Sequence, residues 1–132
     1  MPVQFYRQAF EMIESLRPDN LHVRHSFQTN GVLINTEWCE LFRDWQVGVG
    51  VSIDGPRRFN DVNRLSRKGT STYDKAITGV RLLRGQRVPF HVISVLTRES
   101  LAEPGEMLDF YLSEGITDVC FNVEESEGSQ YN

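Results

Sequence analysis

The sequence has few cysteines, no excess of positive charge and no long apolar run. Its 132 residues include 2 cysteines, Cys39 and Cys120, which are far apart and form neither a disulfide framework nor a self-contained metal-binding motif. The 14 Lys and Arg against 18 Asp and Glu give a net charge of −4, which disfavours nucleic acid and anionic membranes as partners. No stretch approaches the ~20 apolar residues that span a bilayer, and no signal-peptide pattern opens the chain, so we expect a cytoplasmic protein.

The apolar residues that are present follow helical and strand periods in turn, which predicts an α/β fold. Helices are expected after Met1, with Phe5, Ala9, Met12, Ile13 and Leu16 on one stripe, after a cap at Asn35 or Thr36, after a Ser71/Asp74 capping box, and from Pro104 to Gly115. The predicted strands are Leu21–Gln28, Val47–Asp54, Val88–Leu96 and Asp118–Val123. A long polar connection, Gly55 to Thr70, follows the second strand, and connections of this length are often functional.

Four helix-strand pairs without a hairpin signal predict one parallel sheet with its strands in sequential order. Ligands of such sheets bind at the carboxyl ends of the strands, so we look for function just after each predicted strand. The two outer strands would leave unpaired edges, which favours homo-oligomers. We expect residues 1–132 to form one domain, with a polar tail over residues 124–132.

The second predicted strand carries a large difference between its two faces. Its valines and isoleucine alternate with a small or polar set, Gly48, Gly50, Ser52 and Asp54. Packed helices favour the aliphatic face, so the glycine face is expected to line a cavity, where Ser52 and Asp54 suit a ribose or an amino acid. With equal weight, Asp54-Gly55-Pro56 can be read as a simple turn.

Three further positions bear on the same cavity. Gln28 shares the polar face of its strand, although the Asn30-Gly31 dipeptide after it is also a common turn. Arg64 has a guanidinium that can hold a carboxylate, although a solvated charge run is the more frequent explanation. On the last strand, Cys120, Asn122 and Glu124 share the polar parity. The three histidines have no metal-ligand spacing and are interpreted as structural.

The strings HSFQTNGVLIN, VGVGVSIDGPRRFNDVNR and DVCFNVEE, in this order, resemble the middle of a radical S-adenosylmethionine enzyme. The resemblance covers the whole chain and is closest to the SPASM-containing peptide maturases, such as anaerobic sulfatase-maturating enzymes. The FNVEE ending favours the branch that installs cyclophane crosslinks in ribosomal peptides. The resemblance implies a partial (β/α)6 TIM-like barrel, of which this chain would run from the second helix to the sixth strand.

The resemblance also implies an activity for the parent enzyme. It would cleave S-adenosylmethionine reductively at a [4Fe–4S] cluster, and the 5′-deoxyadenosyl radical would abstract hydrogen from a precursor peptide or protein. The C-x-x-x-C-x-x-C loop, the Gly-Gly-Glu segment and the SPASM cysteines of the family are absent from this sequence, so we expect the chain alone to be inactive and to bind neither cofactor tightly. The implied cofactor-binding residues are Gln28, Ser52, Asp54, Arg64, Leu96, Phe121 and Asn122, with Val95 near the adenine.

Two other interpretations of the sequence remain open. The chain can be a stand-alone, non-catalytic module that binds a peptide or a nucleotide. It can also be an unrelated α/β enzyme with Asp54 as a base, for which Glu124 is the only plausible catalytic partner on another strand end.

Overall fold

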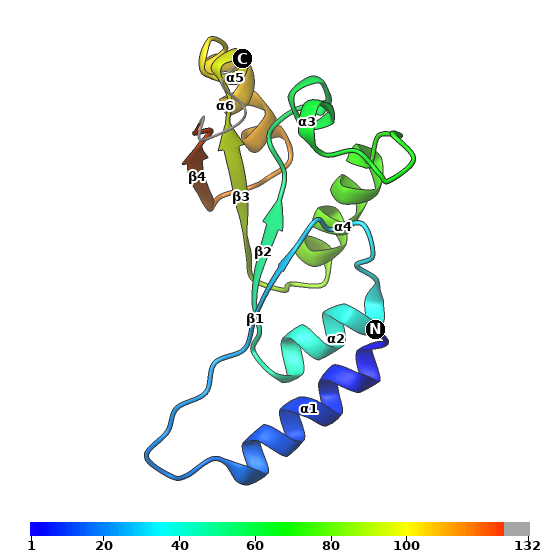
Figure 1. Ribbon diagram of the computed structural model, residues 1–132, viewed down its shortest axis with the longest axis vertical. Coiled ribbons are helices and arrows are strands. Elements are labelled where there is room, and N and C mark those ends of the chain that lie inside the picture. The colour runs from blue at the N-terminus through cyan, green and yellow to red at the C-terminus, as the bar shows by residue number, and fades with distance from the viewer. Residues whose placement is uncertain (126–132) are drawn as a thin grey trace.

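The computed structural model describes residues 1–125, along which helices and strands alternate (Figure 1). The helices are α1 (Val3–Leu16), α2 (Thr36–Asp44), α3 (Arg57–Asn63), α4 (Tyr73–Gly85), α5 (Arg98–Leu101) and α6 (Pro104–Ser113). The strands are β1 (Ser26–Thr29), β2 (Gly48–Ser52), β3 (Phe90–Leu96) and β4 (Val119–Val123). Most of the polar tail expected at residues 124–132 lies outside the described residues.

The strands form one parallel sheet in the order β1-β2-β3-β4, which confirms the predicted α/β class and strand order. Each strand is shorter than predicted. The first begins at Ser26 and not at Leu21, because its partner β2 begins at Gly48, the residue opposite Ser26. The strands are parallel, so all four point toward the end of the molecule where α3 and α5 lie in Figure 1.

The helices cover one face of the sheet, and the core lies between them and the aliphatic side chains of the strands. Val49, Val51 and Ile53 of the second strand are buried there, as predicted from their alternation with the glycines. Their helical partners in the core cluster include Leu41, Ile77, Val80, Leu83 and Phe110. The opposite face of β2 carries the small set of Gly48, Gly50 and Ser52.

The prediction of which side of α1 faces the sheet was wrong. Met12 and Leu16 are 63% and 76% exposed, whereas Val3 and Phe10 are buried. The reason is aromatic packing, since Tyr6 lies edge-on to Phe27 of β1 at 5.0 Å between ring centroids. This contact rotates the helix so that its Tyr6 side, and not its Met12 side, faces the sheet.

The helix caps agree with the sequence in one case and differ in another. Asn35 caps α2, because its side chain accepts a hydrogen bond from the Trp38 amide at 3.0 Å. The Ser71/Asp74 capping box does not form, since Asp74 is paired with Arg57 and Thr72 stands at the cap of α4. A capping box does begin the unpredicted helix α5, between Thr97 and Ser100.

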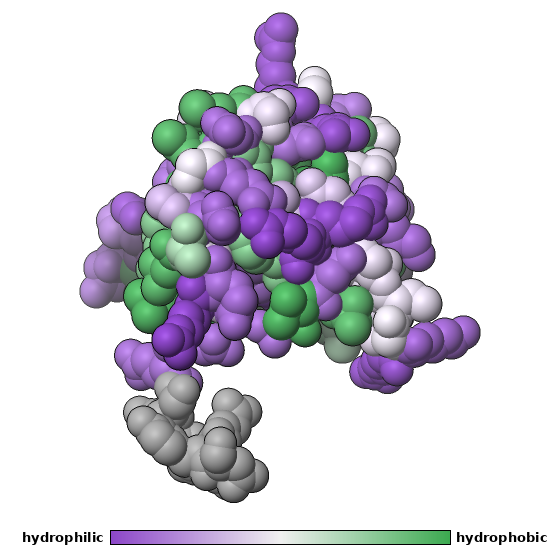
Figure 2. Space-filling view, turned by 90° about the horizontal axis from the view of Figure 1, so that it is seen from above, coloured by the Kyte–Doolittle hydropathy of each residue, from purple (hydrophilic) through white to green (hydrophobic). Residues whose placement is uncertain are grey.

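The long polar connection after β2 contains the second unpredicted helix, α3. Phe59 and Asn60 are its buried residues, so this helix is anchored by one aromatic ring and one amide. Figure 2 views the molecule from the end where α3, α5 and α6 lie in Figure 1, and polar side chains cover most of that face. Within residues 1–125, the helices are too short or too polar to cross a bilayer.

Candidate functional site

The carboxyl ends of β1 and β2 bring two predicted site residues together. Gln28 lies opposite Gly50 in the parallel register, two residues before Ser52, and its side-chain amide donates to the Ser52 hydroxyl at 3.4 Å. Ser52 is buried and Gln28 is exposed. The pair thus places a hydroxyl and an amide, both able to donate and to accept hydrogen bonds, at one point of the sheet edge.

Next to this point the buried Asp54 forms an ion pair with the partly exposed Arg64. The Arg64 Nε and Nη2 atoms donate to the two carboxylate oxygens of Asp54, at 2.8 and 3.0 Å. The carboxylate also accepts the Val95 amide from the neighbouring strand at 2.9 Å, and Asp54 is 3% exposed. Arg64 is therefore held by a buried carboxylate and is not part of a solvated charge run.

Helix α3 is what returns Arg64 to the strand end. The Asn60 side-chain oxygen accepts the Asp54 amide at 3.1 Å, and the Asn60 carbonyl accepts the Arg64 amide at 3.0 Å. Thr72 fixes the far side of the turn, because its hydroxyl donates to the Arg64 carbonyl at 2.9 Å. Asn60 is almost completely buried, so the contact of its side-chain oxygen with the Asp54 amide replaces one with water.

The predicted residues of β3 and β4 divide between the two faces of the sheet. Val95 and Asn122 are register partners and share the Ser52 face, since Ser52 lies opposite Ile93, and Ile93 lies opposite Cys120. Leu96 and Phe121 point to the other face. There they line a cavity of about 290 Å³ with Tyr111, whose ring centroid is 5.9 Å from that of Phe121.

The side chains of Leu96 and Phe121 therefore lie on the face opposite Ser52, and their assignment to the cofactor stays a prediction. Their side chains pack toward α6 because strand parity places them opposite Val95 and Asn122. Only their main-chain groups remain at the edge that Ser52 occupies. The structure does bring Gln28, Ser52, Asp54, Arg64 and Asn122 to that edge or face.

The glycine face also differs from its expected form at Gly50. A Cβ atom there would lie 2.9 Å from Nε2 of His91 and 3.0 Å from Cδ1 of Ile93. The space beside Gly50 is thus filled by the side chains of two neighbours on β3, and it is not a cavity open to a ligand. Sequence reasoning missed both residues, although the parity of β3, which aligns His91 and Ile93 with Val95, could have found them.

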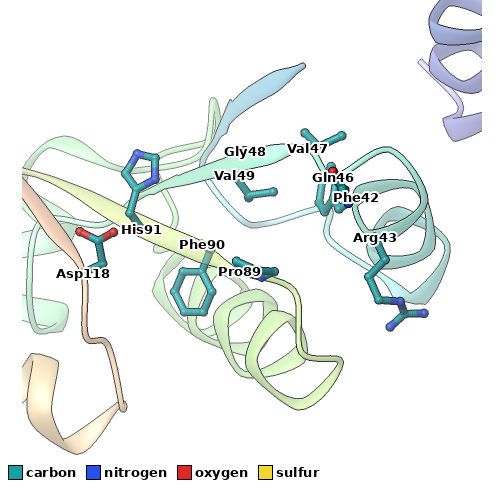
Figure 3. A pocket seen from close by; sticks show the side chains of 10 residues that line it. All are labelled: Phe42, Arg43, Gln46, Val47, Gly48, Val49, Pro89, Phe90, His91 and Asp118. Carbon is teal, nitrogen blue, oxygen red and sulfur yellow. The ribbon is translucent and has the colours of Figure 1, made fainter. Parts of the chain in front are cut away.

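A larger cavity than the one beside Tyr111 lies at the other edge of the sheet. It measures about 580 Å³ and is lined by the first residues of β2 and β3, by Asp118 before β4, and by Arg43 on α2 (Figure 3). Ligands of parallel α/β sheets bind at the carboxyl ends, so chemistry favours the Ser52 edge despite the larger volume at the amino ends. A smaller cavity of about 150 Å³ includes Gln28.

The cysteines do not fit an iron–sulfur cluster. Cys39 is completely buried in α2, where burial raises the pKa of its thiol, and Cys120 is exposed on β4. Clusters need several thiolates around one centre. Among residues 1–125, no group of three His, Cys, Asp or Glu side chains could hold a metal ion.

The geometry also argues against Asp54 as a general base. Its two oxygens already accept three hydrogen bonds, two of them from a guanidinium, so the carboxylate is occupied by partners within the protein. Its suggested partner, Glu124, is exposed, and its main-chain amide donates to the Leu96 carbonyl. The unrelated-enzyme interpretation therefore loses its catalytic residue.

Fold and site together define a parallel β/α unit with polar groups gathered at the carboxyl ends of its strands. The profile of the radical SAM superfamily matches residues 3–111, so the chain belongs to this superfamily. An uncharacterised protein of Synechocystis is 42% identical over 130 residues, which are 96% of this chain and 33% of that protein. The serine-type anaerobic sulfatase-maturating enzyme of Klebsiella aerogenes is 33% identical over 127 residues, which are 96% of this chain and 31% of that enzyme.

Solved structures show the same fold. Native anSMEcpe with bound AdoMet and Kp18Cys peptide superposes with a TM-score of 0.89 at 24% identity, over 99% of this chain and 37% of that one. Streptococcus suis SuiB gives a TM-score of 0.62 at 18% identity, over 83% of this chain and 24% of that one. The sheet thus corresponds to part of a radical SAM barrel, and the chain spans about a third of the length of the curated relatives named above.

Proposed function

We propose that this chain is the S-adenosylmethionine-binding part of a radical SAM enzyme of the anaerobic sulfatase-maturating type, which modifies a peptide or protein substrate. One observation carries the proposal. Gln28, Ser52 and the Asp54–Arg64 pair gather at one strand edge of a chain whose residues 3–111 match the radical SAM superfamily. When bound, S-adenosylmethionine supplies the radical that abstracts hydrogen.

The residues at this edge fit the chemical groups of S-adenosylmethionine. A hydroxyl and an amide, from Ser52 and Gln28, suit a ribose or the polar end of methionine. The guanidinium of Arg64 suits the methionine carboxylate. We assign Asn122 and the end of β3, at Val95 and Leu96, to the neighbourhood of the adenine. The Leu96 and Phe121 side chains are left out of this assignment, because they lie on the other face of the sheet.

The residues of this chain do not fit the [4Fe–4S] cluster, as Cys39 and Cys120 show. We therefore assign the cluster ligands, and any SPASM segment, to other parts of a longer parent enzyme in the cytoplasm. In that enzyme the chain would be one unit of the partial barrel, from its second helix to its sixth strand. By itself the chain would bind the cofactor weakly and be inactive, since it spans about a third of its relatives.

The substrate class rests on relatives. Two serine-type sulfatase-maturating enzymes of Klebsiella are 33% and 32% identical to this chain, and two of the similar solved structures hold a bound peptide. These findings favour a peptide or protein substrate. They do not favour the cyclophane-forming branch over the sulfatase-maturating one.

Binding measurements on the anaerobically reconstituted parent enzyme test the proposal. We expect saturable binding of S-adenosylmethionine, weakened less than roughly tenfold by Ser52→Ala, which removes a neutral hydrogen bond. Ser15→Ala, a control at the exposed end of α1, should bind as the wild type does. Formation of 5′-deoxyadenosine should rise when the substrate peptide is added. An enzyme that binds no S-adenosylmethionine would refute the proposal.

A further inference from the structure

The Asp54 carboxylate is buried and already accepts three hydrogen bonds from within the protein. One oxygen accepts from Arg64 Nε at 2.8 Å, and the other accepts from Arg64 Nη2 at 3.0 Å and from the Val95 amide at 2.9 Å. Asp54 is 3% exposed, so neither oxygen can be reached by a cofactor hydroxyl or amine. The position expected to bind the cofactor therefore has its partners within the protein.

Arg64, in contrast, keeps one edge of its guanidinium open. Its side chain is 26% exposed, and within residues 1–125 only Nε and Nη2 have hydrogen-bond partners. The remaining nitrogen, Nη1, carries two donors in a plane that the bidentate contact with Asp54 fixes. The backbone of Arg64 is fixed as well, by Asn60 on one side and Thr72 on the other.

We propose that Asp54 is a positioning residue, which orients Arg64 for the methionine carboxylate of S-adenosylmethionine without touching the cofactor. This inference rests on the proposed function and assigns a specific part of it. A guanidinium that is already oriented loses less conformational entropy when its ligand binds, so the ligand binds more tightly. The specificity follows too, since the benefit reaches only ligands that carry the carboxylate.

The Val95 amide gives the same carboxylate a second task. Val95 lies on β3, whereas Asp54 follows β2 and Arg64 follows α3, so one carboxylate connects the ends of two strands and a helix. Asp54 therefore holds both the strand assigned to the adenine and the arginine assigned to the methionine. Replacing Asp54 should loosen the methionine end most, because Val95 is also held by the parallel ladder with β4.

Two ligands separate this role from a general structural one. S-adenosylmethionine has the amino-acid group, and 5′-methylthioadenosine has the same nucleoside and sulfur without it. In the reconstituted parent enzyme, Asp54→Asn should weaken binding of S-adenosylmethionine roughly tenfold, because an Arg64 that is no longer oriented loses its charge-assisted contact with the methionine carboxylate. Binding of 5′-methylthioadenosine should stay within about twofold of the wild type. Arg64→Ala should behave alike, and the double variant should show little further loss, because both changes remove one interaction.

Asp61→Asn is the matched control. Asp61 lies in the same helix as Asn60 and accepts from the Ser71 hydroxyl, with no contact to Arg64. It should bind both ligands as the wild type does. If Asp54→Asn fails to fold, the variant Arg64→Lys can be tested in its place, since lysine keeps the charge but cannot make the bidentate contact with Asp54. This variant should also weaken binding of S-adenosylmethionine and leave binding of 5′-methylthioadenosine unchanged.

The outcomes distinguish the positioning role of Asp54 from the proposed binding of S-adenosylmethionine. An equal loss of both ligands in Asp54→Asn, or wild-type binding of S-adenosylmethionine by Arg64→Lys, overturns the positioning role. A wild-type enzyme that binds neither ligand overturns the proposed function itself. In a spectroscopic readout, the Arg64 Nε–H resonance of the 132-residue chain should exchange slowly with water and lose this protection in Asp54→Asn.

Discussion

Arg64 donates from Nε and Nη2 to both carboxylate oxygens of Asp54, although the residues are ten positions apart, one after the end of β2 and the other after the end of α3. The contact exists because α3 turns the chain back over the end of β2. Asn60, in the middle of that helix, accepts the Asp54 amide. The ion pair therefore depends on a third residue, because the hydrogen bond from the Asp54 main-chain amide to the Asn60 side chain holds α3 at the strand end.

Asn60→Ala should destabilise the protein by about 1–3 kcal/mol, because it leaves the buried Asp54 amide without an acceptor. Urea unfolding followed by circular dichroism measures this loss. Asn63→Ala provides the control, since Asn63 is exposed at the end of the same helix and should change the unfolding free energy by less than about 0.5 kcal/mol. Equal effects of the two variants would contradict the role given to Asn60.

Gly79→Ala should also destabilise, because an added Cβ at this position of α4 collides with the carbonyl oxygen of Gly31. Backbone must move to relieve the contact, at a cost of roughly 1–3 kcal/mol. Gly85→Ala, at the end of the same helix, meets no atom within 4 Å and should be neutral or slightly stabilising. Thermal unfolding of the two variants decides the matter; a stabilised Gly79→Ala would show that the two elements are not this close.

The two cysteines should differ sharply in reactivity. Cys120 is exposed on β4, whereas Cys39 is completely buried and burial raises the pKa of its thiol. Iodoacetamide should therefore label only Cys120 in the native chain and both residues in denaturant. Peptide mapping by mass spectrometry identifies the labelled site, and Cys120→Ser should abolish native labelling. Rapid native labelling of Cys39 would contradict its burial.

The sheet leaves β1 and β4 as edge strands, which supports the prediction of homo-oligomers for the isolated chain. Phe121 and Val123 on β4 are 52% and 62% exposed, so association through this edge would bury apolar surface. Light scattering over a range of concentrations should show dimers or larger species. A monomer at every concentration would show that the edge strands do not recruit a second copy.

The fold was predictable to the extent that its signals are local. Alternation along Val47–Ile53 identified both faces of β2, and the absence of hairpin signals identified the parallel order. Helix α3 was not predictable, because its stability depends on the contact of Asn60 with Asp54, six residues earlier in the chain. The rotation of α1 was also hidden, since it is set by the packing of Tyr6 against Phe27.

The candidate site divides in the same way. Strand parity was enough to bring Gln28 to Ser52, because adjacent parallel strands place equivalent residues side by side. The same alternation, applied strictly, predicts that the side chains of Leu96 and Phe121 lie on the helical face, opposite to that of Asn122. The partners of Asp54 could not be read from the sequence, since they come from a helix and a strand that only the tertiary fold brings together.

Tyr111 should make the protein sensitive to alkali. Its hydroxyl donates to Ser94 at 2.9 Å, and burial raises the pKa of the phenol above its ordinary value, outweighing the opposite effect of the Ser94 hydrogen bond. A raised folded-state pKa means that the folded protein holds the proton more tightly than the unfolded chain does. The contribution to stability is thus complete below the unfolded pKa of about 10 and is lost as the pH rises through the folded pKa.

Tyr111→Phe tests this pH dependence. At pH 8 the variant should be less stable by about 1 kcal/mol, because the hydrogen bond to Ser94 is gone. Above pH 10 it has no phenol to ionise at this position, so the difference from the wild type should shrink. Urea unfolding at both pH values measures the difference, and the phenolate absorbance should lose one late-titrating tyrosine. A difference that stays constant with pH would show that Tyr111 ionises equally in the folded and unfolded chains.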